Sequence, residues 1–160
     1  YMEDILKKYL YKYKINYTKY EHRAVFTVEE SRDLKKKIPG LHCKCIFLKD
    51  DSGRFYIVGL PAEKRLDIKK LQLHFVVRKL HFATADELWE KFKLKPGSVS
   101  IFGLVNNSER DVFFILDKEV WSAEAVGFHP NVNTATLVLK HEDLERFYKS
   151  IKNDKEVIEL

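Results

Sequence analysis

The sequence has no long hydrophobic run. No stretch approaches about 18 uninterrupted apolar residues, the length typical of a membrane-spanning helix. The N-terminal segment YMEDILKKYLYKYK places lysines among its apolar residues, whereas a signal peptide has an uninterrupted apolar centre. We therefore expect neither a membrane span nor a secretory signal. Tyr1 precedes the only methionine, and we expect Met2 to be the natural first residue.

Cysteine is also scarce, since Cys43 and Cys45 are the only two. On a strand their side chains share a face, but the loop between them is too short to favour a disulfide. A reducing, cytoplasmic location fits this composition. His42 and His129 are conceivable additions to a metal site, but no second cysteine pair or His-x-x-x-His motif completes one. We expect no metal and no cofactor.

Internal repeats, low-complexity tracts and long linkers are absent as well. With 160 residues, 45% of them hydrophobic and 13% aromatic, the chain is long enough and apolar enough for one domain spanning residues 1–160. The net charge of +5 makes a polyanionic partner plausible. Two basic runs in the first 40 residues are candidate phosphate contacts, and solvated helix faces are the alternative. These runs contain Lys7, Lys8, Lys12, Lys14, Lys35, Lys36 and Lys37.

Helical and extended patterns interleave irregularly, which predicts a mixed α/β or α+β sheet with helices packed on it. We expect an amphipathic helix within residues 1–15, and helices opened by Thr-x-x-Glu capping boxes at Thr27 and Thr84, the second closed by Pro96 and Gly97. Two further helical patterns are DIKKLQLHF and EDLERFYKSI, and the expected strands are YTKYEH, HCKCIFLKD, RFYIVGLP, KLHFAT, DVFFILD and NTATLVLK. Residues 152–160 are expected to be a frayed tail or the start of a link.

Lys44 poses the sharpest question, because it lies within an apolar strand. Strand alternation puts it on the same face as Ile46 and Leu48, while Cys43 and Cys45 face the other way. Either the lysine extends to solvent over apolar surface, or the fold keeps its charge for a cleft.

Two loops also contain residues that suit a binding site. Gly97 in KPGSVSIFGLVNN permits close approach of a ligand to the backbone, and small residues there let main-chain N–H groups face an oxygen atom. The alternative is a plain turn. His129 in GFHPNVNT is held in an extended conformation by the following proline, and is either structural or a site residue that titrates near neutral pH.

The lysine strand with its hairpin, the loop PGSVSIFGLVNN and the loop HPNVN together resemble the YbaK family of aminoacyl-tRNA deacylases, relatives of the editing insertion of prolyl-tRNA synthetases. The resemblance runs from about Tyr20 to Phe147 and includes LPAEKRLDIKKL. It is greatest to the free-standing branch that removes alanine from mischarged proline tRNA. It implies a largely antiparallel sheet or partial barrel with surrounding helices.

The resemblance also implies roles for individual residues. Lys44, His129 and Gly97 match the family's catalytic positions, with Lys44 anchoring the terminal phosphate or polarising the ester. The implied substrate contacts are Cys45, Ser98, Val99, Ser100, Ile101, Pro130 and Asn133. Cys45 stands where the alanine-specific branch usually has asparagine, and Ile101 stands where the family's Gly-x-x-x-Pro loop ends in proline.

The implied reaction is hydrolysis of the ester in Ala-tRNA(Pro), helped by loop N–H groups that stabilise the oxyanion and by a water that the ribose 2'-OH orients. The tRNA acceptor end is then the partner, with a transient association with prolyl-tRNA synthetase. Three alternatives remain: a deacylase for cysteine or serine, a binding module without activity, and an editing domain excised from a synthetase.

Overall fold

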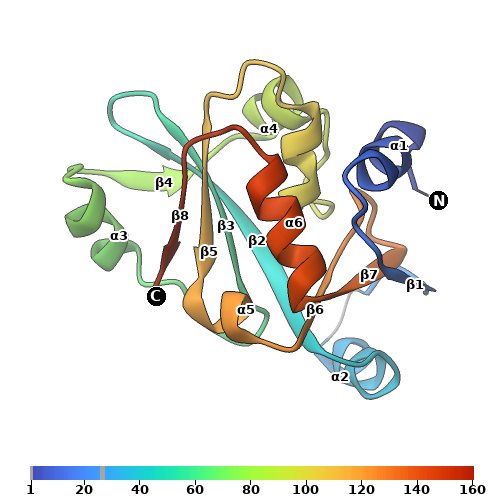
Figure 1. The fold of residues 1–160 in the computed structure, drawn as a ribbon. Helices are drawn as coiled ribbons and strands as arrows, with labels where there is room; N and C mark the ends of the chain where they lie inside the picture. Colours follow the sequence, from blue (N-terminus) through green and yellow to red (C-terminus); the bar gives the residue numbers. More distant parts are fainter. Residues whose placement is uncertain (1, 26–27) are drawn as a thin grey trace.

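The computed structural model describes residues 2–25 and 28–160 and shows helices packed around a mixed sheet (Figure 1). The helices are α1 (Asp4–Lys12), α2 (Val28–Lys37), α3 (Ile68–Phe75), α4 (Ala85–Phe92), α5 (Lys118–Ser122), α6 (His141–Ser150) and the 3-10 helix η1 (Ile101–Asn106). The strands are β1 (Thr18–Glu21), β2 (Leu41–Asp50), β3 (Phe55–Pro61), β4 (Leu80–Phe82), β5 (Val112–Asp117), β6 (Ala125–Phe128), β7 (Ala135–Lys140) and β8 (Lys155–Ile158).

The strands form one sheet in the order β1-β7-β6-β2-β3-β5-β8, with β4 also paired to β2. Among the described residues, four strand pairings are antiparallel and three are parallel. The predicted mixed, mostly antiparallel sheet with surrounding helices is therefore confirmed. Strands β1 and β8 form its two ends, so the sheet is open.

Strand β2 joins the two halves of this sheet. One edge pairs with β3 over residues 43–49. The other edge pairs with β6 only at residues 41–42 and with β4 only at residues 48–50. Within the described chain, the stretch between them, which includes Lys44, has a strand partner on one edge only. The sheet consequently opens beside Lys44.

The hairpin between β2 and β3 follows from its turn chemistry. The buried Asp50 carboxylate accepts hydrogen bonds from the backbone N–H groups of Ser52 and Arg54 and from the Tyr56 hydroxyl, at 2.9, 2.9 and 2.6 Å. Gly53 takes a positive φ of 88°, which glycine adopts without strain. The predicted hairpin is confirmed.

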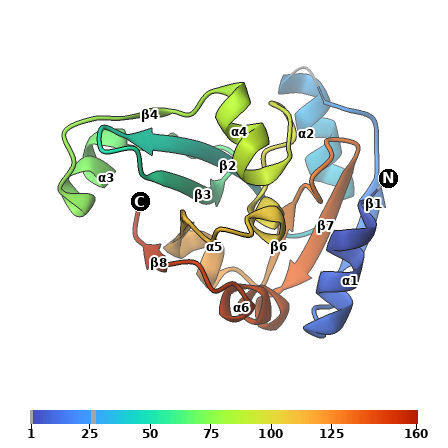
Figure 2. The same ribbon diagram turned by 90° about the horizontal axis from the view of Figure 1, so that it is seen from above.

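The helices divide between the two faces of the sheet. Helices α1, α4, α5, α6 and η1 contribute buried side chains to the main core, whereas α3 covers a second, smaller cluster that includes Leu48, Leu60 and Leu71. Figure 2 shows α1 and α2 on opposite sides of β1 and β7. Leu6 and Leu10 of α1 are buried, whereas Ile5 is 61% exposed.

Several sequence-based expectations need correction. Helix α4 opens with the predicted Thr84 capping box but ends at Phe92, because Lys93 takes the left-handed conformation (φ 56°) well before Pro96. Residues 155–158 are not a frayed tail, since they form β8 and pair in parallel with β5. Strand β6, helix α5 and η1 were not predicted. The Thr27 capping box lies outside the described residues.

Candidate functional site

Lys44 is half-buried, yet its ammonium makes no ion pair or hydrogen bond within residues 2–25 and 28–160. It lines a cavity of about 800 Å³ together with Ile46, Leu66, Ile68 and Phe82. No carboxylate of the described residues pairs with the Lys44 ammonium, so its positive charge is available to attract an anionic ligand that enters the cavity. Of the two possibilities raised for Lys44, the cavity lining fits a cleft lysine.

Three histidines gather next to this strand. His42 precedes Lys44 by two residues and shares its face of β2. The His22 and His129 rings lie 6.1 Å apart, centroid to centroid. His22 is fixed by hydrogen bonds to Arg23 O (2.8 Å) and Thr136 Oγ1 (2.9 Å), and His42 Nε2 by one to Ile38 O (3.0 Å).

His129 is held as a neutral imidazole. Burial lowers its pKa below the ordinary value, and nearby His22 and His42 lower it further, against the opposing effect of the bond to Ala135. Because Nδ1 lies 2.9 Å from the carbonyl oxygen of Ala135, the ring proton resides on Nδ1 and Nε2 is an acceptor. His129 can therefore position a polar group near neutral pH.

The loop that begins at Gly97 is tied to the His129 loop. The buried Ser100 hydroxyl donates to the carbonyl oxygen of His129 and accepts from the backbone N–H of Phe102 at 3.1 Å, which caps η1. Gly97 has φ 92°, and a Cβ there would lie 3.9 Å from Nδ2 of Asn133. The two loops that the resemblance singled out are therefore neighbours.

The loop that begins at Gly97 has several backbone N–H groups without a hydrogen-bond acceptor among the residues that the structure describes. The Ser98 N–H donates to Lys95 O, whereas in the described part of the chain the N–H groups of Gly97, Val99 and Ser100 have no partner. Unpaired backbone N–H groups on a short loop can bind an anion or a developing oxyanion.

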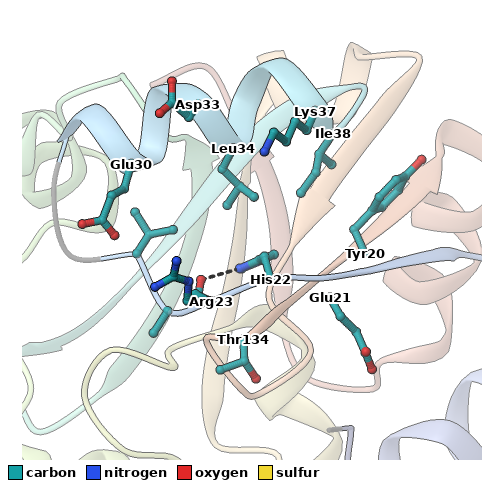
Figure 3. A pocket seen from close by; sticks show the side chains of 12 residues that line it. Tyr20, Glu21, His22, Arg23, Glu30, Asp33, Leu34, Lys37, Ile38 and Thr134 are labelled. Atoms are coloured by element: carbon teal, nitrogen blue, oxygen red, sulfur yellow. Dashed lines mark hydrogen bonds between the residues drawn. The ribbon is translucent and has the colours of Figure 1, made fainter.

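A large cavity lies between α2 and the segment that follows β1 (Figure 3). Its volume is about 1040 Å³, and Leu34 of α2 and Ile38, the residue after α2, point into it toward His22. Thr134, one residue after Asn133, lines it as well. The cavity thus combines an apolar wall from α2 with polar groups from the histidine side.

The Cys45 side chain lies on the other face of β2, packed against the main core. Burial raises the pKa of its thiol to about 12, only partly offset by a hydrogen bond from the Ile101 backbone. The thiol is neutral at physiological pH, so it is a poor nucleophile. The two departures from the family pattern, Cys45 and Ile101, are in contact, and a proline at position 101 would lack this N–H.

The remaining predicted residues are those beside the two loops and the lysines of the two basic runs. Pro130 and Ile101 are buried beside the two loops, and Asn133 is half-buried near Gly97. Of the lysines, Lys37 lines the large cavity, while Lys35 pairs with Glu63 at 3.0 Å. Helix α1, which carries Lys7, Lys8 and Lys12, lies on the opposite side of β1 and β7 from α2, so the structure does not bring these two helices and their basic runs together (Figure 2).

Most residues that line the large cavity were not predicted from the sequence. His22 follows β1, Leu34 lies in α2 and Ile38 follows it, and no motif pointed to any of the three. His42 was considered only as a metal ligand. The available signal was the residue type: the chain has only six histidines, so each of them, including His22 and His42, was a candidate site residue. Within the described residues, no group of three or more His, Cys, Asp or Glu side chains is arranged to hold a metal ion.

An unpaired strand lysine, a loop with unpaired N–H groups and a neutral histidine, set on an open mixed sheet, are groups that suit an anionic ligand bearing a carbonyl group. Residues 22–147 match the family model for the aminoacyl-tRNA editing domain. The chain is 39% identical over 148 residues to prolyl-tRNA editing protein ProX of Acetoanaerobium sticklandii, covering 92% of this chain and 90% of that protein. It is 33% identical over 139 residues to prolyl-tRNA synthetase associated domain-containing protein 1 of Bos taurus, covering 84% and 81%.

Solved structures agree in fold. A candidate trans-editing enzyme for prolyl tRNA synthetase superposes with a TM-score of 0.75 at 17% identity, covering 100% of this chain and 98% of that one. The chain therefore belongs to the aminoacyl-tRNA editing domain family, as the motif resemblance predicted. Its class of reaction is the hydrolysis of an aminoacyl-tRNA ester. No helix of the described residues is long and apolar enough to span a membrane.

Proposed function

We propose that this protein edits in trans by hydrolysing Ala-tRNA(Pro). The observation that carries the proposal is the meeting of the Gly97 loop and the His129 loop through Ser100, beside a strand that bears the unpaired Lys44. The 39% identity to a prolyl-tRNA editing protein supports proline tRNA as the substrate.

The aminoacyl end occupies the cavity between α2 and the segment after β1. Its volume of about 1040 Å³ is far more than an alanine side chain fills and suits an amino acid joined to an adenosine. Leu34 and Ile38 provide the apolar wall for the amino-acid side chain. His129 positions the ester through Nε2, its acceptor nitrogen.

The chemistry requires charge stabilisation and an oriented water. The ammonium of Lys44 contacts the phosphate of the terminal nucleotide or polarises the ester carbonyl. The free N–H groups of Gly97, Val99 and Ser100 stabilise the oxyanion that forms when water attacks. The 2'-OH of the ribose orients that water, so the reaction uses no protein nucleophile.

Size exclusion sets the amino-acid preference. An apolar pocket separates side chains that differ by one methylene by only about 10- to 200-fold. We therefore expect alanine first, and weaker hydrolysis of cysteinyl and seryl esters.

The basic residues and the cellular setting complete the proposal. Lys7, Lys8, Lys12 and Lys14 and the α2 run Lys35 to Lys37 contact tRNA phosphates, and their position on two sides of the sheet lets them meet different parts of the acceptor arm. The protein works in the cytoplasm, where its two free thiols stay reduced, and associates transiently with prolyl-tRNA synthetase.

The test measures deacylation of Ala-, Cys-, Ser- and Pro-tRNA(Pro) by the wild type, Lys44→Ala and the control Lys118→Ala, an exposed lysine of α5. We expect Ala-tRNA(Pro) to be hydrolysed fastest, with loss of the activity in Lys44→Ala alone. Preferred hydrolysis of another ester would replace alanine in the proposal. Binding of tRNA without hydrolysis of any ester would instead support the non-catalytic module.

A further inference from the structure

The cavity beside Lys44 is distinct from the one that α2 lines, and its walls mix charge with apolar surface. Its charged members are Lys44, Glu63, Arg65, Asp67 and Lys69, and its apolar members are Ile46, Leu66, Ile68 and Phe82. Its volume of about 800 Å³ is in the range of small-ligand sites.

The positive charges of this cavity are free, and its negative charges are engaged. Glu63 pairs with Lys35 at 3.0 Å, and the Asp67 carboxylate accepts the backbone N–H of Lys70 at the start of α3. In the described ranges, the side chains of Arg65 and Lys69, like that of Lys44, have no ion pair or hydrogen bond. The cavity therefore presents three available cations to an anionic ligand.

Phe82 gives the same cavity an exposed aromatic ring. It is 65% exposed, although large apolar side chains are usually buried. It lies on the edge strand β4 directly opposite Leu48, so its side chain is on the face of the sheet that carries Lys44. An exposed ring among free cations is the arrangement with which proteins bind single-stranded nucleic acid, since bases stack on rings and phosphates meet cations.

An ion pair links the surroundings of the two cavities. The Lys35–Glu63 ion pair connects α2, which lines the large cavity, with the rim of the smaller one. His42 and Leu48, the partner of Phe82, are six residues apart on β2, about 20 Å at the usual rise of a strand. Lys44 lies between them.

We propose that this cavity binds the nucleotides that precede the terminal adenosine of the tRNA, with a cytosine stacked on Phe82 and their phosphates contacted by Arg65 and Lys69. The inference rests on the proposed function, because it takes the aminoacyl adenosine to lie in the cavity of α2. Lys44 then contacts the phosphate at the boundary between the two cavities.

The experiment measures the dissociation constant of an uncharged acceptor-stem hairpin RNA ending in CCA, and of the same RNA with abasic sugars in place of both cytosines. The proteins are the wild type, Phe82→Ala and the control Trp89→Ala, whose ring on α4 is 51% exposed and lines neither cavity. Loss of the bases should weaken binding to the wild type and to Trp89→Ala by about 5- to 150-fold. It should leave binding to Phe82→Ala nearly unchanged.

A second arm tests the phosphate contacts. Arg65→Gln should reduce the slope of log Kd against log salt by about 0.7, the value for one contact to a single strand, while Lys70→Gln, a neighbouring lysine outside the cavity, should not. Equal affinity of the wild type for both RNAs, or equal sensitivity of Phe82→Ala to base removal, would overturn the inference. Since binding is measured without an ester, failure of alanine as the substrate would leave this test intact.

Discussion

Replacement of Ser100 by alanine tests the link between the two loops of the site. The buried hydroxyl donates to His129 O and accepts from Phe102 N–H, and alanine can do neither. Loss of the two bonds leaves the buried Phe102 N–H and the partly buried His129 carbonyl unsatisfied, at a cost of about 1–3 kcal/mol each. We expect Ser100→Ala to lower the free energy of unfolding by about 2–4 kcal/mol. This is less than the sum of the two largest costs, because the effects of neighbouring interactions are not additive.

The same change should impair catalysis beyond its effect on stability. Without the Ser100 bond, the free N–H groups of the Gly97 loop lose their fixed position relative to His129, and misplacement by about 1 Å can cost about 100-fold in rate. We expect kcat to fall roughly 10- to 100-fold while KM changes little, because oxyanion contacts form in the transition state.

A matched variant separates the two effects. Thr84→Ala removes the capping box of α4 and should cost about 0.5–2 kcal/mol without touching either loop. Urea unfolding and steady-state deacylation of Ala-tRNA(Pro) are measured for both variants, at a temperature where both are folded. Wild-type kcat in a folded Ser100→Ala protein would refute the reasoning, as would an equal loss of kcat in Thr84→Ala.

Three further predictions follow from single residues. Cys45→Ala should keep kcat near the wild-type value in the deacylation assay, because burial raises the thiol pKa to about 12 and no thiolate is available; abolished turnover would show that the thiol acts as a nucleophile. For His129, the folded-state pKa lies below the ordinary 6.5, so the unfolded chain binds more protons and the free energy of unfolding should decrease as pH falls through about 6.5. Urea unfolding of wild type and His129→Gln at several pH values checks this, since the slope should be smaller in the variant. Gly103→Ala would place Cβ 2.7 Å from Cδ2 of Phe92 and should destabilise the protein by about 1–3 kcal/mol in thermal or urea unfolding; unchanged stability would mean that the core adjusts freely.

The elements that local chemistry specifies were predictable. Asp51, Ser52 and Gly53 between two apolar runs indicate a hairpin, and Thr84 with Glu87 indicates a helix start, because the groups that interact are within a few residues of each other. Strand alternation also predicted that Lys44 and Cys45 face opposite sides of β2. The roles of the residues in the two loops came from the family resemblance, because the residues alone left a plain turn and a structural histidine as alternatives.

Other features depend on partners far along the chain. Residues 155–158 include only two β-branched residues, too few to predict a strand from local pattern, and they form β8 where they pair with β5 and where Asn153 bonds to Val112 O at 2.8 Å. The end of α4 at Lys93 likewise could not be read from Pro96 and Gly97. Long-range pairing decides such segments, and no local pattern records it.

The sequence by itself determined the hairpin, the capped helix, the alternation that frees Lys44 from the main core, and the family of the chain. Only the tertiary structure decided that His22 and His42 accompany His129, that the α2 side chains wall a large cavity, and that Phe82 shares a second cavity with Lys44. The physical reason is that a side chain's neighbours within an element follow from its backbone period, whereas its neighbours across the sheet depend on strand order, which here joins β1, β7, β6 and β2 out of chain order.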